Sequence, residues 1–213
     1  MDAAVSVQNV SKKFGADRVL VNVTHDFMPG KIHGIAGNNG SGKTVLMKCI
    51  CGFLIPDHGK IIVNHQQVGK DVDFPDDIGI IIETPGFLPY LSGMKNLEIL
   101  ASLKQKVHAA GIREAIRRVG LDPSLKKPVG KYSLGMRQRL GIAQAIMENP
   151  SILILDEPLN GLDKSGVQQM RELMKELRAL GKTIILASHQ AKDVDELCDT
   201  VCEMDAGILT DVR

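Results

Sequence analysis

Short hydrophobic runs recur along the chain, and they predict the strands of a sheet. Three continuous apolar runs are found at residues 78–82, 152–155 and 183–187. A fourth, at residues 32–36, stops at a glycine-rich loop. Runs of this length without polar alternation are typical of parallel strands that are covered on both faces. Nearer the N-terminus, valines at positions 5, 7 and 10 and the apolar segment 19–21 predict two more strands, followed by a turn at Pro29 and Gly30.

Helical spacing of apolar residues dominates the middle of the chain. Between Pro85 and Pro150 it is found, with few β-branched residues, at residues 94–106, 112–119 and 133–148. The same spacing appears at 45–50, directly after the glycine-rich loop. A strand, a glycine loop and a helix in this order open a parallel α/β sheet. We therefore expect one α/β domain over residues 1–213, with a core of 1–85 and 150–213 and an inserted helical subdomain of 86–149.

Composition narrows the class of protein. The chain has 213 residues, a formal net charge of +1 and only 3% aromatic residues, with no tryptophan. This length suits one domain, and the balanced charge argues against a nucleic-acid partner. No stretch approaches the ~18–20 apolar residues of a spanning helix, and the start of the chain is unlike a signal peptide. We expect a soluble protein in the cytoplasm.

Four cysteines are spaced unlike the common zinc-binding patterns. They form a C-x-C pair at 49 and 51 and a C-x3-C pair at 198 and 202. Common zinc sites combine paired cysteines with further Cys or His ligands at set spacings, and the two pairs here differ from those patterns. We therefore expect reduced, mostly buried thiols in preference to a metal site.

The glycine-rich loop has the composition of a phosphate-binding loop. It fits the pattern G-x-x-x-x-G-K-[ST] with Gly37, Asn38, Asn39, Gly40, Ser41, Gly42, Lys43 and Thr44, and Val45 continues into the helix. Glycines let the backbone turn its N–H groups towards phosphate oxygens, and the helix that follows directs its positive end at the same anion. In this pattern Lys43 reaches the β- and γ-phosphates, and the Thr44 hydroxyl can bind Mg²⁺. The sequence therefore predicts a nucleotide site.

Two carboxylates follow the strand predicted at 152–155. A buried strand would deliver Asp156 to the carboxyl edge of the sheet, where it can hold Mg²⁺ directly or through water. Glu157 lies one residue further and can polarise the water that attacks the γ-phosphate. A strand followed by an acidic turn is common without function, but the phosphate loop earlier in the chain favours the catalytic interpretation.

Several motifs together resemble the ATP-binding cassette (ABC) ATPases. Residues 156–163 resemble the second Walker motif and the D-loop of that family, and residues 132–139 resemble its signature, usually written LSGGQ. Ser188 and His189 match the switch histidine, and Phe14 matches the aromatic residue that stacks on adenine. The resemblance extends from Phe14 to residues 207–209. It implies a P-loop NTPase core of the RecA-like, ABC type, with an antiparallel β-portion near the N-terminus.

The resemblance also implies a role for each matching residue. Glu157 would be the general base, His189 the switch and Lys43 the phosphate clamp, with Thr44, Glu83 and Asp156 holding Mg²⁺. The signature residues Ser133, Leu134, Gly135 and Met136 would meet ATP held by a second subunit, with Ser133 also capping a helix. The D-loop would be Asn160, Gly161, Leu162 and Asp163. ATP and Mg²⁺ are then the cofactors, and a head-to-tail dimer of cassettes is expected.

Two departures from the family pattern point to one branch of it. Glu83 stands where the family has a glutamine, and Leu134, Gly135 and Met136 replace Gly-Gly-Gln. With residues 81–89 and 132–136, these departures resemble ATPases of bacitracin-resistance and lantibiotic-immunity exporters. Ser133 and Gly135 keep the phosphate contact, whereas Met136 should lose a polar contact to the nucleotide.

The prediction for function follows from the resemblance. We expect an ATP-hydrolysing subunit that powers a separate integral membrane permease and exports an antimicrobial peptide or related antibiotic. Such a subunit would lie on the inner face of the cell membrane through the permease, docked near the segment after Glu83. One alternative is an ATP-binding regulatory module in which Glu83 and the altered signature leave hydrolysis negligible. Another is an ABC ATPase outside transport, although such chains usually carry coiled-coil inserts or two cassettes.

Overall fold

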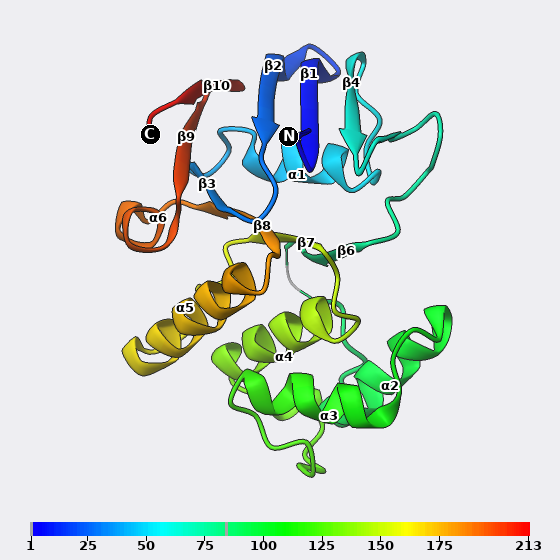
Figure 1. Ribbon diagram of the computed structural model, residues 1–213. Helices are drawn as coiled ribbons and strands as arrows, with labels where there is room; N and C mark the ends of the chain where they lie inside the picture. Colours follow the sequence, from blue (N-terminus) through cyan, green and yellow to red (C-terminus); the bar gives the residue numbers. More distant parts are fainter. Residues whose placement is uncertain (1, 84) are drawn as a thin grey trace.

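Two β-sheets occupy one end of the molecule, and a group of helices forms the other (Figure 1). The structure, a computed structural model, describes residues 2–83 and 85–213. Met1 of the predicted core and Thr84, part of the segment 81–89 used above, lie outside the described residues. The predicted α/β class with an antiparallel portion near the N-terminus is confirmed.

The antiparallel sheet has the strand order β2-β1-β4-β5. Its members are β1 (Val5–Phe14), β2 (Asp17–Phe27), β4 (His58–Val63) and β5 (Gln66–Gln67). In the register, Val5 lies opposite both Phe27 of β2 and Val63 of β4, and all three side chains are buried. One face of the sheet therefore packs on the core, as is usual for antiparallel sheets.

The second sheet runs in the order β10-β9-β3-β8-β7-β6. Its strands are β3 (Ile32–Ala36), β6 (Ile78–Ile81), β7 (Ile152–Asp156), β8 (Thr183–Ser188), β9 (Thr200–Asp205) and β10 (Ile208–Asp211). All neighbours pair in parallel except β10, which pairs antiparallel with β9 at the edge. The four predicted apolar runs are confirmed as β3, β6, β7 and β8.

Alternate residues of the parallel strands face two separate hydrophobic cores. On β7, Ile152 and Ile154 pack with the antiparallel sheet and helix α1 (Lys43–Ile50), whereas Leu153 and Leu155 pack with the remaining helices. Both faces of the strand are covered, and polar residues are therefore excluded until the chain leaves the sheet at Asp156. The site residues follow at that edge.

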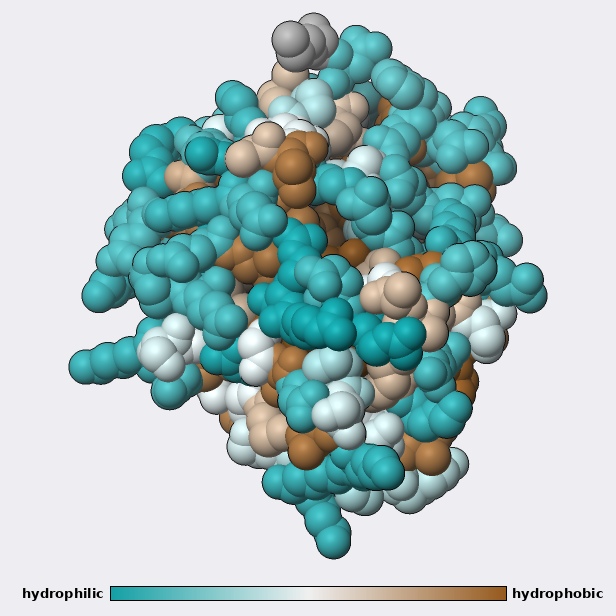
Figure 2. Space-filling model, turned by 60° about the horizontal axis from the view of Figure 1, so that its bottom comes forward, coloured by the Kyte–Doolittle hydropathy of each residue, from teal (hydrophilic) through white to brown (hydrophobic). Residues whose placement is uncertain are grey.

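Helices from the middle of the chain form a layer at the end of the molecule opposite the antiparallel sheet (Figure 1). They are α2 (Gly93–Lys104), α3 (Ala109–Arg118), the short η1 (Val129–Lys131) and α4 (Leu134–Ile146). They match the three helical segments predicted between Pro85 and Pro150, while the division into 1–85, 86–149 and 150–213 stays a prediction. The face they form is mostly hydrophilic, with small hydrophobic patches between the charged side chains (Figure 2).

Several elements were absent from the predictions. They are β4, β5, β9, β10, α5 (Lys164–Ala179) and α6 (Ala191–Leu197). Helix α5 carries buried Met170, Leu173, Met174 and Leu177, which have the helical spacing that identifies an amphipathic face. The described helices include none with the length and apolar character that a bilayer-spanning helix requires.

Candidate functional site

The phosphate loop connects the end of β3 to the start of α1. At Gly42 φ is +116°, and a Cβ there would lie 2.8 Å from the Val19 carbonyl oxygen. At Gly37 a Cβ would lie 2.3 Å from the Met204 carbonyl oxygen. Only glycine fits these two positions, and the loop backbone is thereby fixed. Helix α1 starts at Lys43 without a side-chain cap, so its first N–H groups are available to an anion.

Two buried polar side chains inside the loop fit a phosphate group. Lys43, only 5% exposed, donates through Nζ to the carbonyl oxygens of Gly37 (2.7 Å) and Asn38 (2.9 Å). An ammonium has three donors, which leaves one for a phosphate oxygen. The hydroxyl of Ser41 is buried and has no hydrogen-bond partner among the described residues. A buried hydroxyl without a partner is costly, and a bound phosphate would satisfy it.

A cavity of about 220 Å³ opens in front of the loop. Its walls come from the loop, from β2 and from the end of β7: Val19, Asn39, Gly40, Gly42, Lys43, Thr44, Val45, Asp156 and Glu157. The structure therefore brings together residues that lie more than a hundred positions apart in the sequence. Most of the predicted phosphate and metal residues share this one cavity.

Thr44 and Asp156 form the candidate magnesium pair. The Thr44 hydroxyl donates to Asp156 Oδ2 at 2.6 Å, and Asp156 is only 8% exposed. Burial raises the pKa of Asp156, the hydrogen bond from Thr44 opposes that shift, and the charges of Glu157 and Glu83 add to it. A bound divalent cation would stabilise the buried negative charge of Asp156. Hydroxyl and carboxylate oxygens are also the ligands that Mg²⁺ prefers. These residues fit the ion.

Glu157 and His189 meet where β7 and β8 end. The Glu157 carboxylate accepts two hydrogen bonds on Oε1, from the His189 backbone N–H at 2.9 Å and from His189 Nδ1 at 2.8 Å. Because a carboxylate only accepts, His189 must carry a proton on Nδ1. Glu157 has a left-handed backbone (φ +50°), an uncommon conformation for a residue with a Cβ. The carboxylate is fixed in place, and its second oxygen can accept from a water.

Gln138 of α4 supports the same turn, a role that its place in the segment 132–139 did not predict. Its Nε2 donates to the carbonyl oxygens of Glu157 (3.2 Å) and Pro158 (3.0 Å). The start of α4 is thereby tied to the turn that carries the candidate base. The sequence contains no separate signal for this contact because Gln138 lies 19 positions before Glu157.

Glu83 lies just beyond β6 and is paired with a lysine. Lys48 Nζ of α1 lies 2.6 Å from Glu83 Oε1, with the two side chains 28% and 64% exposed. Like Glu157, Glu83 has a left-handed backbone (φ +60°). Glu83 is close enough to Asp156 to raise its pKa, but it is not among the residues that line the phosphate cavity. Its predicted part in holding Mg²⁺ stays a prediction.

The signature residues begin α4, and Ser133 caps it as predicted. The Ser133 hydroxyl accepts from the Met136 backbone N–H at 3.2 Å. A Cβ on Gly135 would lie 2.9 Å from the Gly161 carbonyl oxygen, so the signature packs on the D-loop of its own chain. Among the described residues, those lining the phosphate cavity include none of 133–136.

The D-loop residues lead into α5. Asp163 caps that helix: its carboxylate accepts from the Gly166 backbone N–H at 2.9 Å and from the Ser165 hydroxyl at 3.1 Å. These hydrogen bonds hold the pKa of Asp163 below its usual range, the Gly166 bond most of all. Asn160 accepts from Gln190 at 3.4 Å, and Leu162 packs against the helical core. Capping is therefore one role of Asp163 that the structure describes.

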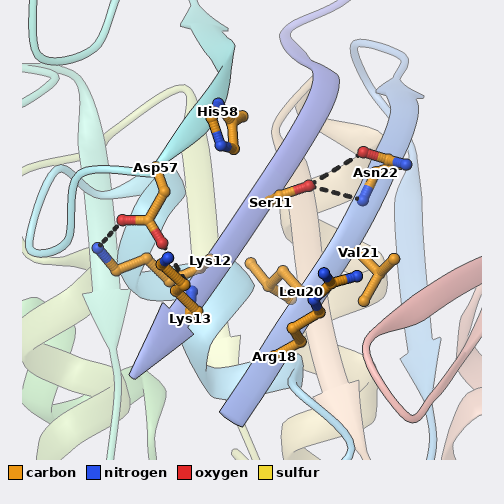
Figure 3. Close-up of a pocket in the computed structure, with 9 residues that line it drawn as sticks. All are labelled: Ser11, Lys12, Lys13, Arg18, Leu20, Val21, Asn22, Asp57 and His58. Carbon is orange, nitrogen blue, oxygen red and sulfur yellow. Dashed lines mark hydrogen bonds and ion pairs between the residues drawn. The ribbon is translucent and has the colours of Figure 1, made fainter. Parts of the chain in front are cut away.

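Phe14 ends β1 with 47% of its surface exposed, outside the phosphate cavity. Lys12 Nζ lies 5.8 Å from the centre of its ring. Beside it, β1, β2 and the start of β4 form a hollow of about 270 Å³ with basic side chains around it (Figure 3). Lys12 is neutralised there by Asp57 at 2.9 Å. The stacking role of Phe14 stays a prediction.

The four cysteines are free and buried, as predicted. Burial raises the pKa of Cys49 to about 11 and that of Cys51 to about 12. These thiols are therefore protonated and unreactive at neutral pH.

Comparisons with known proteins agree with this geometry. The family model described as ABC transporter matches residues 20–160. The chain is similar to the uncharacterized ABC transporter ATP-binding protein YybJ of Bacillus subtilis, with 42% identity over 96% of this chain and 94% of that protein. It is 37% identical to the bacitracin transport ATP-binding protein BcrA of Enterococcus faecalis, over 99% of this chain and 69% of BcrA.

Further relatives support the predicted branch and fold. The lantibiotic transport ATP-binding protein SrtF of Streptococcus pyogenes is 36% identical over 92% of this chain and 85% of SrtF. A solved structure described as an ATP binding subunit of ABC transporter superposes with a TM-score of 0.87 and 26% identity, covering 99% of this chain and 90% of that one. The predicted resemblance to bacitracin and lantibiotic transport ATPases is therefore confirmed. This chain belongs to the ABC transporter family, as an ATP-binding subunit with ATPase activity.

Proposed function

We propose that the cavity between the phosphate loop and the end of β7 binds MgATP and hydrolyses its γ-phosphate. The loop N–H groups and Lys43 bind the phosphates, and the Thr44 and Asp156 oxygens hold Mg²⁺. When bound, the ion neutralises charge on the phosphates. The observation that carries the proposal is the convergence of the Thr44–Asp156 and Glu157–His189 pairs at one edge of the sheet.

Glu157 is the general base of this proposal. Its carboxylate takes a proton from water while the water oxygen bonds to the γ-phosphorus, and the bond to the bridging oxygen breaks to leave ADP and phosphate. His189 holds Glu157 through two hydrogen bonds and orients it. In this proposal His189, which follows β8, also contacts the γ-phosphate and changes its hydrogen bonds when that phosphate is lost.

The experiment is the Glu157→Gln substitution. Because the amide cannot take a proton, steady-state phosphate release should fall by about 100- to 10,000-fold, while ATP binding persists. Glu172→Gln, on the exposed side of α5, is the matched control and should keep full turnover. Wild-type turnover in Glu157→Gln would contradict the assignment.

We further propose that two cassettes close head-to-tail around ATP. The exposed Leu134 and the start of α4 lie outside the phosphate cavity of their own chain, which leaves the signature available to a nucleotide on a partner cassette. The Glu157→Gln variant with ATP and Mg²⁺ should elute as a dimer in size-exclusion chromatography, and Ser133→Arg should prevent this. A monomer that binds ATP in both variants would argue against the dimer but not against the ATP site.

The partner that converts ATP turnover into transport is proposed to be an integral membrane subunit. An apolar groove of about 270 Å³ is lined by β6 and by parts of α2 and α4, with Phe53, Phe74 and Leu103 exposed on its walls. The rings of Phe53 and Phe74 lie 6.0 Å apart. A hydrophobic helix end from the membrane subunit suits these walls. The cassette would then sit on the inner face of the membrane.

The relatives favour a peptide antibiotic as the exported substrate, because BcrA and SrtF are described as bacitracin and lantibiotic transport proteins. Co-expression with a candidate membrane subunit should yield a complex that Phe74→Ser disrupts and that Leu180→Ser, exposed at the end of α5, leaves intact. Cells expressing the pair should tolerate more bacitracin or lantibiotic than cells with Glu157→Gln. Equal tolerance would contradict the substrate and leave the ATPase assignment standing.

A further inference from the structure

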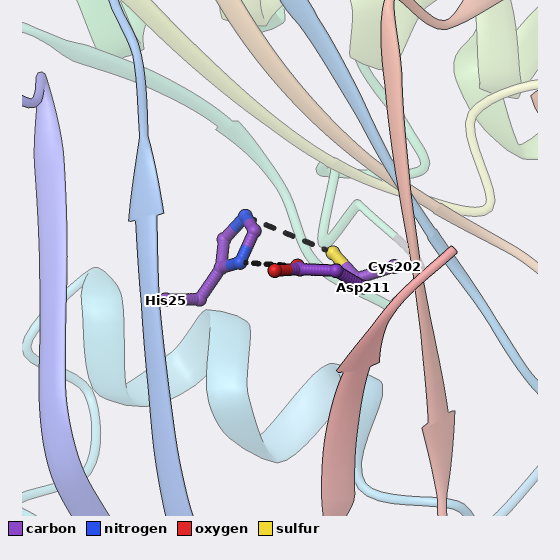
Figure 4. A group of neighbouring side chains, drawn as sticks. All are labelled: His25, Cys202 and Asp211. Atoms are coloured by element: carbon purple, nitrogen blue, oxygen red, sulfur yellow. Dashed lines mark hydrogen bonds and ion pairs between the residues drawn. The ribbon is translucent and has the colours of Figure 1, made fainter. Parts of the chain in front are cut away.

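Three side chains of metal-ligating types meet outside the phosphate cavity, where the terminal hairpin packs on β2 (Figure 4). Cys202 of β9 and Asp211 of β10 lie directly opposite each other in the hairpin register, so their side chains share one face. His25 comes from β2 and faces both of them. The nucleotide chemistry proposed above uses none of the three residues.

The imidazole of His25 is oriented by contacts on both of its nitrogens. Nδ1 lies 3.0 Å from Asp211 Oδ1, and Nε2 lies 3.9 Å from Cys202 Sγ. The ring also packs edge-to-face on Phe27, with centroids 4.5 Å apart. Because the Asp211 carboxylate only accepts, Nδ1 carries the proton and the lone pair of Nε2 points at the thiol.

We propose that His25 Nε2 and Cys202 Sγ bind one divalent transition-metal ion of the zinc type, and that Asp211 orients the histidine. Imidazole nitrogen and thiolate sulfur are both ligands of zinc in proteins. One ligand atom from each of the three side chains lies within 4.8 Å of the others. Tetrahedral zinc, with bonds of about 2.0 Å to nitrogen and 2.3 Å to sulfur, places these two atoms about 3.5 Å apart. The observed 3.9 Å needs a closure of only a few tenths of an ångström.

Asp211 has two roles in this site. One carboxylate oxygen accepts from His25 Nδ1–H, which fixes Nε2 as the ligating nitrogen, an arrangement that recurs around metal-bound histidines. Its second role is to leave the site open to solvent. The Asp211 side chain is 79% exposed, so the ion has a path from solvent and water can complete the coordination.

Binding is coupled to loss of the thiol proton. The Cys202 thiol is buried and lies 3.5 Å from the Gly34 carbonyl oxygen, which can accept a hydrogen bond from it. The thiol is therefore protonated without metal. When the sulfur–metal bond forms, the S–H bond breaks and one proton goes to solvent. The ion would join β2 of the antiparallel sheet to β9 and β10 of the other sheet.

Cobalt(II) is the spectroscopic probe for this site. Tag-free, nucleotide-free protein titrated with Co²⁺ should show a near-ultraviolet thiolate-to-cobalt charge-transfer band that saturates at one ion per chain and that Zn²⁺ removes. The band requires sulfur, so Co²⁺ bound by Asp156 or Glu157 cannot produce it. Proton release into a weak buffer should equal about one proton per zinc ion bound.

Variants assign the ligands. Cys202→Ser should abolish the band, and Asp211→Asn should weaken Co²⁺ binding by about 10- to 100-fold. Asp211 is exposed, so that variant keeps the fold, and circular dichroism checks both proteins. Cys49→Ala, whose thiol lies near Lys12 and Asp57, is the control and should keep the band. Absence of the band in the wild type, its survival in Cys202→Ser, or its loss in Cys49→Ala would overturn the site.

Discussion

Lys48 Nζ lies 2.6 Å from Glu83 Oε1, and this ion pair joins the phosphate-loop helix to the residue that replaces the family's glutamine. A neutral glutamine would not pair with the lysine in this way. The positive charge of Lys48 weakens the attraction of the Glu83 carboxylate for Mg²⁺, because it offsets the negative charge that the ion would bind. The pair therefore competes with the metal role proposed for Glu83.

This competition predicts a change in magnesium requirement. Lys48→Gln should release Glu83 and lower the Mg²⁺ concentration that gives half-maximal ATPase activity. Exposed pairs contribute at most about 1 kcal/mol, so the expected shift is about fivefold or less. Lys95→Gln breaks the exposed Lys95–Glu98 pair on α2 and serves as the control.

A double-mutant cycle separates this effect from a general loss of charge. In a Glu83→Gln background, the Lys48→Gln substitution should leave the magnesium requirement unchanged, since no carboxylate remains to be released. An equal shift in both backgrounds would show that Lys48 acts on the nucleotide and not through Glu83.

Local signals in the sequence were sufficient for the strands that position the site. The residues of β7 alternate between two hydrophobic cores, with Leu153 and Leu155 in one and Ile152 and Ile154 in the other. The whole strand is therefore apolar, and a run of apolar residues can be recognised in the sequence. The loop from Gly37 onward was recognisable because its glycines, its lysine and its threonine each have a known role in binding phosphate and Mg²⁺.

Contacts between distant segments could not be predicted in the same way. His25 and Cys202 are 177 positions apart, and no local sequence pattern indicates that the two residues meet. In the sequence, Gln138 is one polar position on an amphipathic helix. In the structure, its amide donates hydrogen bonds to two carbonyl oxygens of the turn after β7. Such contacts depend on the packing of whole elements, and single-sequence periodicity does not report that packing.

His33 predicts a pH dependence of stability. It is 1% exposed in β3, with Nδ1 2.7 Å from the Thr200 hydroxyl and Nε2 2.8 Å from the Met28 carbonyl oxygen. Burial lowers its pKa from 6.5, and the Met28 bond only partly opposes this. The folded protein thus binds fewer protons than the unfolded chain at acid pH. Above pH 6.5 His33 is neutral in both states and does not change the free energy of unfolding, whereas below pH 6.5 it lowers that free energy as the pH falls.

Chemical denaturation at several pH values tests this sign. The free energy of unfolding should fall below about pH 6.5 with a His33 contribution of up to about 1.4 kcal/mol per pH unit. His33→Gln should be less stable near neutral pH but should show a smaller fall. His58→Gln, at an exposed position, should keep the wild-type slope. If the free energy of unfolding of His33→Gln falls with pH as steeply as that of the wild type, groups other than His33 cause the pH dependence.

Phe14 offers a direct test of adenine stacking. The chain has no tryptophan, so Phe14→Trp introduces a single fluorophore whose emission should change when ATP stacks on it. Loss of stacking in Phe14→Ala should weaken ATP binding by about 5- to 150-fold, from about 1–3 kcal/mol per stacked base. Phe53→Trp is the matched control, since Phe53 is 48% exposed compared with 47% for Phe14 but lies in the apolar groove. An equal response from both positions would argue against stacking at Phe14.

Gln138 should control turnover through the turn that carries Glu157. Gln138→Glu has nearly the same shape but cannot donate, and it would place a carboxylate against the carbonyl oxygens of Glu157 and Pro158. Loss of such contacts costs about 1–2 kcal/mol, so kcat should fall by about 5- to 30-fold as Glu157 loses its fixed position.

A positioning role can be separated from a role in binding by the kinetic constants. KM for ATP should stay near the wild-type value in Gln138→Glu, because the phosphate loop does not contact Gln138. Gln168→Glu, where the glutamine side chain donates to Glu172 on the exposed side of α5, should leave both constants unchanged. If KM rises while kcat is kept, Gln138 acts on nucleotide binding, and the carbonyl contacts to the turn are structural only.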